Sequence, residues 1–231
     1  MKILAIDTST DACSVALFID ETVTGRFEMA PRRHTELVLP MAQALLDAAG
    51  LRVQDLDAVA FGRGPGAFTG LRIAAGVAQG IALGADIPVI PVSTLATLAQ
   101  ALFDADRAEC VATALDARMG EVYWGGFCRD PDGVAAPVIP EAVGAADAVE
   151  IPAGADWVGA GSGWGAYGDV LQARFAEGGL KATLPEVSPD AAAMHRLARR
   201  AFLRGDLLPA EQAQPIYLRD DVAKKPGAAK A

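Results

Sequence analysis

One pattern occurs twice in this chain: an apolar run that ends in an aspartate and is followed by a hairpin. The first copy spans Ile3–Glu28, where Asp7 closes the apolar run, and the second spans Val111–Phe127, where Asp116 takes the same position. A short continuous apolar run is typical of a strand buried in a sheet. The repeat therefore predicts an α/β fold of two related lobes with a cleft between them.

We expect a first lobe over residues 1–106, a second lobe over residues 107–223 and a disordered tail over residues 224–231. The 231 residues are enough for two small lobes with a full core. The tail has no apolar pattern. The expected strands are Ile3–Asp7, Val15–Ile19, Glu21–Glu28, Asp57–Phe61, Pro88–Val92, Val111–Leu115, Glu121–Phe127 and Trp157–Gly161. The expected helices are Thr35–Ala49, Leu71–Ala85, Thr94–Phe103, Gly163–Arg174 and Asp190–Arg204, and Pro131–Pro152 is expected to be irregular.

A glycine-rich segment, residues 62–72, lies between a predicted strand and a predicted helix. It holds four glycines and a proline, and its candidate binding residues are Gly64, Gly66, Thr69 and Gly70. Glycine permits positive φ angles and close backbone approach, which an anion-binding loop needs, and the following helix would point its free amides at the same place. The lysine that follows the glycines in a P-loop is absent from this segment.

The turns after the two aspartate-ending runs are further candidates for a phosphate cleft. Asp7, Thr8 and Ser9 place an acid and two hydroxyls at one strand end, and Asp116 has the equivalent place in the second lobe. Such groups can bind phosphate or metal-bound water. The alternatives are hydroxyls that cap free amides in a turn, and an internal ion pair between Asp116 and Arg118.

Charge and composition exclude some functions. The net charge is −9, so we expect any contact with RNA to depend on a partner that supplies positive surface. The three cysteines are far apart in sequence, which argues against a disulfide framework or a zinc site and fits a reducing cytoplasm. The longest apolar stretch, residues 73–87, includes Gln79 and Asp86 and is shorter than the roughly 20 residues of a membrane span. We therefore expect a cytoplasmic protein that does not bind a membrane.

Ligands for a catalytic metal are scarce. The chain has two histidines, His34 and His195, which lie in different predicted lobes. A catalytic zinc or iron site usually needs three protein ligands at compatible spacing. A lone histidine near a helix end is more often a capping or surface group, and no nucleophile motif is visible.

The helix after the glycine segment carries small residues one turn apart, at Gly76 and Gly80. Small side chains allow another helix to approach closely, and the helix is apolar nearly all round, so we expect it to be buried on more than one side. Packing inside the fold and packing against a partner are both open. The interface hypothesis uses this helix and Thr35–Ala49, through Leu37, Met41, Leu45, Ile73, Gly76, Val77 and Gly80.

Several motifs, taken together and in order, resemble the TsaB (YeaZ) family of bacterial tRNA-modification proteins. The matching segments are Met1–Thr10, Arg33–Pro40, Gly64–Ile73, Leu115–Tyr123 and Pro215–Arg219. The resemblance implies the actin/Hsp70/sugar-kinase-like (ASKHA) fold. It also implies a role beside TsaD, the subunit that transfers a threonylcarbamoyl group from threonylcarbamoyl-AMP to N6 of adenosine 37 in tRNAs reading ANN codons.

What the resemblance implies for this chain is a supporting role without a cofactor or metal. The family pairs with TsaD and with the ATPase TsaE. Without the partner, we expect the apolar surface of this chain to self-associate into a homodimer. TsaD carries an Asn-His-x-x-x-His motif, and the comparable segment here places Thr94 and Leu98 where imidazoles are required. The alternatives are an active ASKHA-type kinase or ATPase built on Asp7 and Asp116, and a glycoprotease, whose metal ligands are missing.

Overall fold

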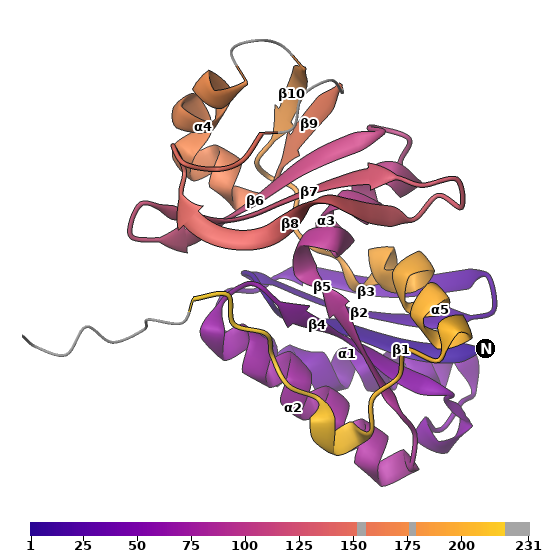
Figure 1. Cartoon of the computed structure of the whole chain (residues 1–231). Helices are drawn as coiled ribbons and strands as arrows, with labels where there is room; N and C mark the ends of the chain where they lie inside the picture. Colours follow the sequence, from indigo (N-terminus) through magenta and orange to yellow (C-terminus); the bar gives the residue numbers. More distant parts are fainter. Residues whose placement is uncertain (152–155, 176–178, 220–231) are drawn as a thin grey trace, which may run out of the picture.

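The computed structural model describes residues 1–151, 156–175 and 179–219. It consists of two lobes, each built around a five-stranded sheet, that lie one above the other in Figure 1. The first sheet has the order β3-β2-β1-β4-β5 and the second β8-β7-β6-β9-β10, so the two orders match strand by strand. The predicted repeat is therefore confirmed: β1 and β6 are the central strands that end near Asp7 and Asp116.

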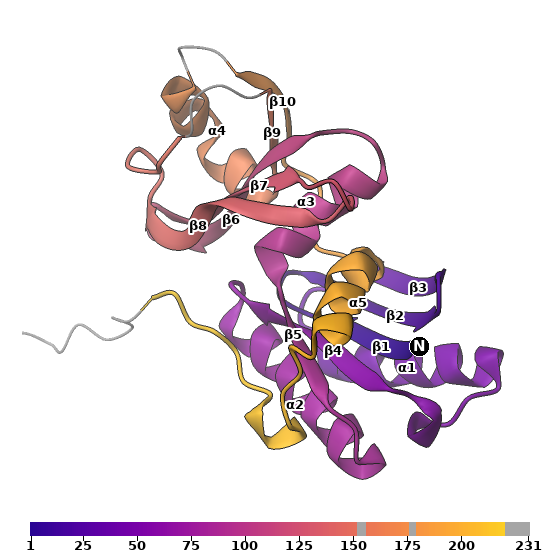
Figure 2. The ribbon, with the colours of Figure 1, turned by 45° about the vertical axis from the view of Figure 1, so that its right-hand side comes forward.

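The first sheet combines β1 (Lys2–Asp7), β2 (Ala12–Ile19), β3 (Thr22–Met29), β4 (Ala58–Gly64) and β5 (Val89–Ser93). Side chains alternate between its faces. Leu4 and Ile6 pack with α1 (His34–Ala49) and α2 (Phe68–Ala85), whereas Ile3 and Ala5 pack with α5 (Met194–Arg204). Figures 1 and 2 show α1 and α2 together on one face of this sheet and α5 on the other.

The second sheet combines β6 (Cys110–Arg118), β7 (Glu121–Arg129), β8 (Ala135–Ala145), β9 (Trp157–Ala160) and β10 (Leu180–Leu184). On one face of this sheet, Val111 and Leu115 pack with α3 (Thr94–Asp104). On the other face, Ala112 and Ala114 pack with α4 (Ser162–Arg174). Helix α3 lies between the two sheets in both views and connects the lobes.

Two strands differ from the prediction. The segment expected to be irregular contains β8, and β10 was not predicted. Strand β8 includes Pro137 and Pro140, which cannot donate to a ladder and so make a sequence read as non-strand. Both β8 and β10 are edge strands of their sheet. An edge position tolerates proline, because one side of the strand needs no partner.

The chain returns to the first lobe after β10. The short helix Ala191–Ala193 and α5 cover its sheet, Leu208 forms a bridge with Val89, and Ala210 and Ala213 join the core beneath α2. These contacts differ from the predicted assignment of all of residues 107–223 to the second lobe. The predicted disordered tail, residues 224–231, lies outside the described residues.

The expectation that the cysteines form no disulfide is wrong. Cys110 and Cys128 are joined by a disulfide bond, with their Cα atoms 4.1 Å apart. They lie directly opposite each other on β6 and β7. The hairpin between them brings together two residues that are 18 positions apart in sequence. Cysteine usage therefore no longer supports a reducing compartment, and Cys13 is free and buried.

Candidate functional site

The turn after β1 is closed to solvent. Ser9 donates two hydrogen bonds to Oδ1 of Asp7, from its backbone N–H at 2.8 Å and from its hydroxyl at 2.6 Å. The other carboxylate oxygen of Asp7 is buried without a hydrogen-bond partner. The pKa of Asp7 is raised to about 6, because burial disfavours its charged form. The hydrogen bonds from Ser9 lower the pKa but do not outweigh the burial. An acid so enclosed offers no free surface to a ligand.

The glycine-rich segment packs directly onto this turn. Strand β4 runs through Gly64 and α2 begins at Phe68, so the connecting turn is shorter than the predicted loop. The hydroxyl of Thr8 donates to the carbonyl oxygen of Gly70 at 2.7 Å, and the N–H of Ala67 donates to the carbonyl oxygen of Ser9 at 2.7 Å. The predicted residues thus come together, but they bond to one another rather than framing an open cradle.

Three of the four glycines in this segment lie against backbone of another part of the chain. A Cβ at Gly66 would overlap the carbonyl oxygen of Ser9, and a Cβ at Gly70 would overlap that of Thr8. Gly64 has a φ of +108° and lies against the carbonyl oxygen of Ile216. Thr69 is exposed. The glycines therefore serve contact between chain segments, a role that the sequence pattern does not separate from anion binding.

Asp116 occupies the equivalent strand end in the second lobe and is engaged in local contacts. Its carboxylate forms an ion pair with Arg118 at 3.0 Å and accepts from the hydroxyl of Tyr167 at 3.3 Å. Its backbone N–H donates to the hydroxyl of Ser162 at 3.1 Å. This contact agrees with the alternative that Asp116 forms an internal ion pair with Arg118 rather than binding phosphate.

The positions compared with metal ligands are buried in the core. Thr94 and Leu98 have no exposed surface, and Leu98 packs in the apolar cluster of α3. Within residues 1–151, 156–175 and 179–219, no group of three or more His, Cys, Asp or Glu side chains could hold a metal ion. His34 contacts the carbonyl oxygen of Ala12 at 3.2 Å, and His195 that of Asp20 at 3.0 Å.

The outer face of α2 is open, contrary to the expectation that this helix is buried on more than one side. A Cβ at Gly76 or Gly80 would meet nothing within 4 Å. Of the other predicted interface residues, Leu45 is buried in the core. The remaining four, which pack at the edge of this core, are partly buried: Leu37, Met41, Ile73 and Val77. Gly76 and Gly80 therefore do not serve packing inside this chain.

By length and composition, α2 is the one helix in the described part of the chain that could cross a membrane. Its inner face argues for a different role. Leu71, Ala74, Ala78 and Ala82 are buried on that face, which packs against β4. A helix with one face in a core and the other face open is typical of a layered α/β lobe.

A cavity of about 480 Å³ lies on the border of the lobes. Most of the residues that line this cavity are apolar. Its polar groups include Arg63 of β4 and Glu141 of β8, which form an ion pair at 3.1 Å. The hydroxyl of Ser93 donates a hydrogen bond to the same carboxylate. Ser93 also caps α3, since its hydroxyl accepts from the N–H of Ala96 at 3.0 Å. No local sequence pattern indicates the Arg63–Glu141 pair, because its members are 78 positions apart.

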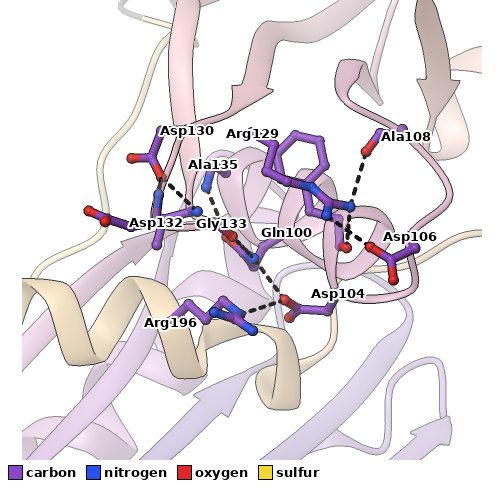
Figure 3. Close-up of polar contacts among 12 residues, drawn as sticks. Gln100, Asp104, Asp106, Ala108, Arg129, Asp130, Asp132, Gly133, Ala135 and Arg196 are labelled. Carbon is purple, nitrogen blue, oxygen red and sulfur yellow. Dashed lines mark hydrogen bonds and ion pairs between the residues drawn. The ribbon is translucent and has the colours of Figure 1, made fainter.

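A second polar network joins α3 and α5 to the β7–β8 hairpin (Figure 3). Gln100 donates to Asp104 and to the carbonyl oxygen of Gly133, and Arg196 of α5 forms an ion pair with Asp104 at 3.0 Å. Arg200 of α5 pairs with Asp130 at 2.5 Å. These bonds fix the second lobe to the helix that covers the first lobe, and no local sequence pattern indicates them.

The chain is similar in sequence and in structure to proteins of one family. Residues 27–225 match the family described as TsaD, tRNA N6-adenosine threonylcarbamoyltransferase. The chain is 46% identical to the tRNA threonylcarbamoyladenosine biosynthesis protein TsaB of Escherichia coli, over 97% of both chains, and 41% identical to that of Haemophilus influenzae, over 97% of this chain and 96% of the relative. A solved structure called YeaZ from Pseudomonas aeruginosa has a TM-score of 0.85 and 45% identity, and covers 94% of this chain and 99% of its own.

Proposed function

Because the chain belongs to the TsaB (YeaZ) family of tRNA threonylcarbamoyladenosine biosynthesis proteins, which has the ASKHA fold, we propose that it is the non-catalytic partner of TsaD. In this role it supports transfer of the threonylcarbamoyl group from threonylcarbamoyl-AMP to N6 of adenosine 37 in tRNAs that read ANN codons. TsaD performs the chemistry and the ATPase TsaE joins the complex. We place the complex in the cytoplasm because its proposed substrate is tRNA, and not because of the cysteine usage.

The observation that carries the non-catalytic role is the closed contact between the β1 turn and α2. Asp7 is buried and its Oδ1 is occupied by Ser9, while Thr8 and Gly70 bond to each other. A phosphate or a metal-bound water would need these groups free. Asp116 is likewise occupied, by Arg118. These contacts support the view that the nucleotide-binding loops of the fold remain here only as structural turns.

The observation that supports a partner role is the outer face of α2. Gly76 and Gly80 are exposed and leave room for a second helix to approach, and Ile73 and Val77 border them. A homodimer of the isolated chain would use the same face. The net charge of −9 supports contact with tRNA only through the complex.

The test is reconstituted threonylcarbamoyl transfer to tRNA with purified TsaD and TsaE, with and without this chain, and with this chain alone. We expect activity only when the chain and TsaD are both present. Transfer, ATP turnover or peptide cleavage by the chain alone would contradict the proposal, and saturable ATP binding by it would favour the kinase or ATPase alternative.

The interface is tested separately with two glycine variants. Gly76→Leu should abolish the heterodimer with TsaD while the isolated chain stays folded, because the added side chain fills the space that a helix needs. Gly144→Leu is the matched control, since Gly144 lies on β8 and a Cβ there also meets nothing within 4 Å. Intact binding by Gly76→Leu would discard the helix face.

A further inference from the structure

The exposed face of α2 does not end with its glycines. Phe68 and Arg72 precede Gly76 and Gly80 at intervals of four residues, so the four residues follow one line along the helix. Phe68 is 56% exposed, although it is a large aromatic side chain. An aromatic residue and an arginine therefore stand at the N-terminal end of the face that the proposed function assigns to a partner.

A residue from the far end of the chain completes this cluster. The ring of Tyr217 lies 5.7 Å from the ring of Phe68, measured between centroids, and is 42% exposed. The guanidinium carbon of Arg72 lies 3.2 Å from the centroid of Phe68 and 5.0 Å from that of Tyr217. The cation is thus stacked on one ring and close to the other.

The chain segment that carries Tyr217 is anchored to both lobes. The N–H of Ile216 donates to the carbonyl oxygen of Arg63 at 2.7 Å, and Arg219 donates to the carbonyl oxygen of Ala117 at 3.1 Å. Arg219 also forms an ion pair with Glu121. Tyr217 is therefore held beside α2 before any partner arrives, which lowers the entropy that binding costs.

No acidic side chain forms an ion pair with Arg72 in the parts of the chain that the structure describes. One N–H of its guanidinium donates to the carbonyl oxygen of Phe68 at 3.3 Å, and no ion pair involves it. Tyrosine and arginine are, with tryptophan, the residue types enriched among the interface residues that dominate binding energy. An acidic side chain on a partner would complete this cluster.

We propose that Phe68, Arg72 and Tyr217 form one anchor of the interface with the TsaD subunit, and that TsaD presents a carboxylate to Arg72. This inference rests on the proposed function and extends its interface from the helices to the C-terminal segment. A protein partner is favoured over RNA, because the cluster offers a single cation on a chain of net charge −9. A partner surface that presents a carboxylate is favoured over a purely apolar helix, because an apolar helix would leave Arg72 without an ion pair.

The test measures the dissociation constant of the heterodimer by calorimetry with purified full-length chains. Tyr217→Ala and Arg72→Ala should each weaken binding by about tenfold or more, the range of a dominant interface residue. Arg72→Glu should weaken it further, through repulsion of the partner's carboxylate. Tyr217→Phe should bind within about threefold of the natural chain, because the stacked ring remains. Phe27→Ala, an exposed aromatic on β3, is the control and should bind normally.

The outcomes separate this inference from the proposed function. If the natural chain does not bind TsaD, the proposed function fails and this inference fails with it. If Gly76→Leu abolishes binding and Tyr217→Ala does not change it, only the inference is overturned. Loss of tRNA crosslinking or of the homodimer by Arg72→Ala, with the heterodimer intact, would also overturn it. Circular dichroism melting of each variant confirms that binding is compared between folded chains.

Discussion

The hydroxyl of Thr8 donates a hydrogen bond of 2.7 Å to the carbonyl oxygen of Gly70, the third residue of α2. This contact ties the turn after the central strand to the first turn of the helix. The approach is so close that Gly70 has no room for a Cβ next to the carbonyl oxygen of Thr8. It explains a glycine at a helical position, where glycine costs about 0.5–1 kcal/mol relative to alanine.

The first prediction compares two glycines of the same helix. Gly70→Ala should lower the free energy of unfolding by about 1–3 kcal/mol, because its Cβ collides with backbone that cannot move away easily. Gly76→Ala should raise it by about 0.5–1 kcal/mol, since its Cβ meets nothing and alanine favours the helix. Urea denaturation of both variants measures the difference. Equal effects at the two positions would show that the contact with Thr8 does not constrain residue 70.

The second prediction concerns the pH dependence that Asp7 creates. Its pKa in the folded chain is about 6, against an ordinary value of 3.8, so the folded state holds this proton more tightly than the unfolded state. Stability from this group is therefore complete below about pH 4 and is lost as the pH rises through 6, by up to about 3 kcal/mol. Asp7→Asn cannot ionise and keeps an oxygen that accepts from Ser9.

The free energy of unfolding of Asp7→Asn, relative to the natural chain, should therefore rise by up to about 3 kcal/mol between pH 4 and pH 7. Urea denaturation at several pH values measures this change. Asp11→Asn, at an exposed position three residues beyond Thr8, is the control and should follow the natural chain. Curves for Asp7→Asn that run parallel to those of the natural chain would contradict the prediction.

Apolar runs and their terminal acids were enough to predict the two related lobes. A buried central strand must be apolar on both faces, and Asp7 and Asp116 stand at the ends of the apolar runs that became β1 and β6. The edge strands of the second sheet were harder to predict. Pro137 and Pro140 break the pattern of β8, and an edge strand is held by its neighbour rather than by its own sequence.

The candidate site was predicted in membership but not in chemistry. The sequence patterns placed Thr8 and Gly70 in two separate candidate phosphate-binding turns. An anion-binding glycine and a glycine required by close approach look the same in sequence. The stack of Tyr217 on Phe68 and Arg72 depends on the C-terminal segment returning across the first lobe. Local sequence patterns do not report a contact over such a separation.

The third prediction concerns Gln100, a buried side chain with every hydrogen-bonding atom used. Its amide donates to Asp104 and to the carbonyl oxygen of Gly133, and its oxygen accepts from the N–H of Ala135, each at 2.9 Å (Figure 3). Gln100→Leu leaves the buried N–H of Ala135 unpaired and should cost roughly 3 kcal/mol of unfolding free energy.

Gln43→Leu is the matched control for this variant. Gln43 also donates to an aspartate four residues later, Asp47, but on the exposed face of α1. Its replacement should change the unfolding free energy by less than about 0.5 kcal/mol. If the two variants were equally stable, the network at Gln100 would not contribute to the attachment of the β7–β8 hairpin.

The fourth prediction concerns Arg200, which pairs with Asp130 and links α5 of the first lobe to the β7–β8 hairpin of the second. The hydrogen bond from this guanidinium lowers the pKa of Asp130 to about 2. A lowered carboxylate pKa contributes stability above the ordinary value of 3.8, and this stability is lost as the pH falls toward 2. Arg200→Met should therefore return the pKa of Asp130 toward 3.8.

Carboxyl chemical shifts followed by NMR during acid titration measure this change directly. The loss of stability in Arg200→Met should be greatest near neutral pH and should shrink as the pH falls from about 4 to 2. The unfolded chain takes up the proton of Asp130 below its ordinary pKa of 3.8, whereas the folded natural chain takes it up only near 2. Arg204→Met is the control, since Arg204 lies on the same helix and forms no ion pair with the described residues. An unchanged titration of Asp130 in Arg200→Met would mean that Arg200 does not hold this carboxylate. The link between the lobes would then rest on the Arg196–Asp104 pair and on Gln100.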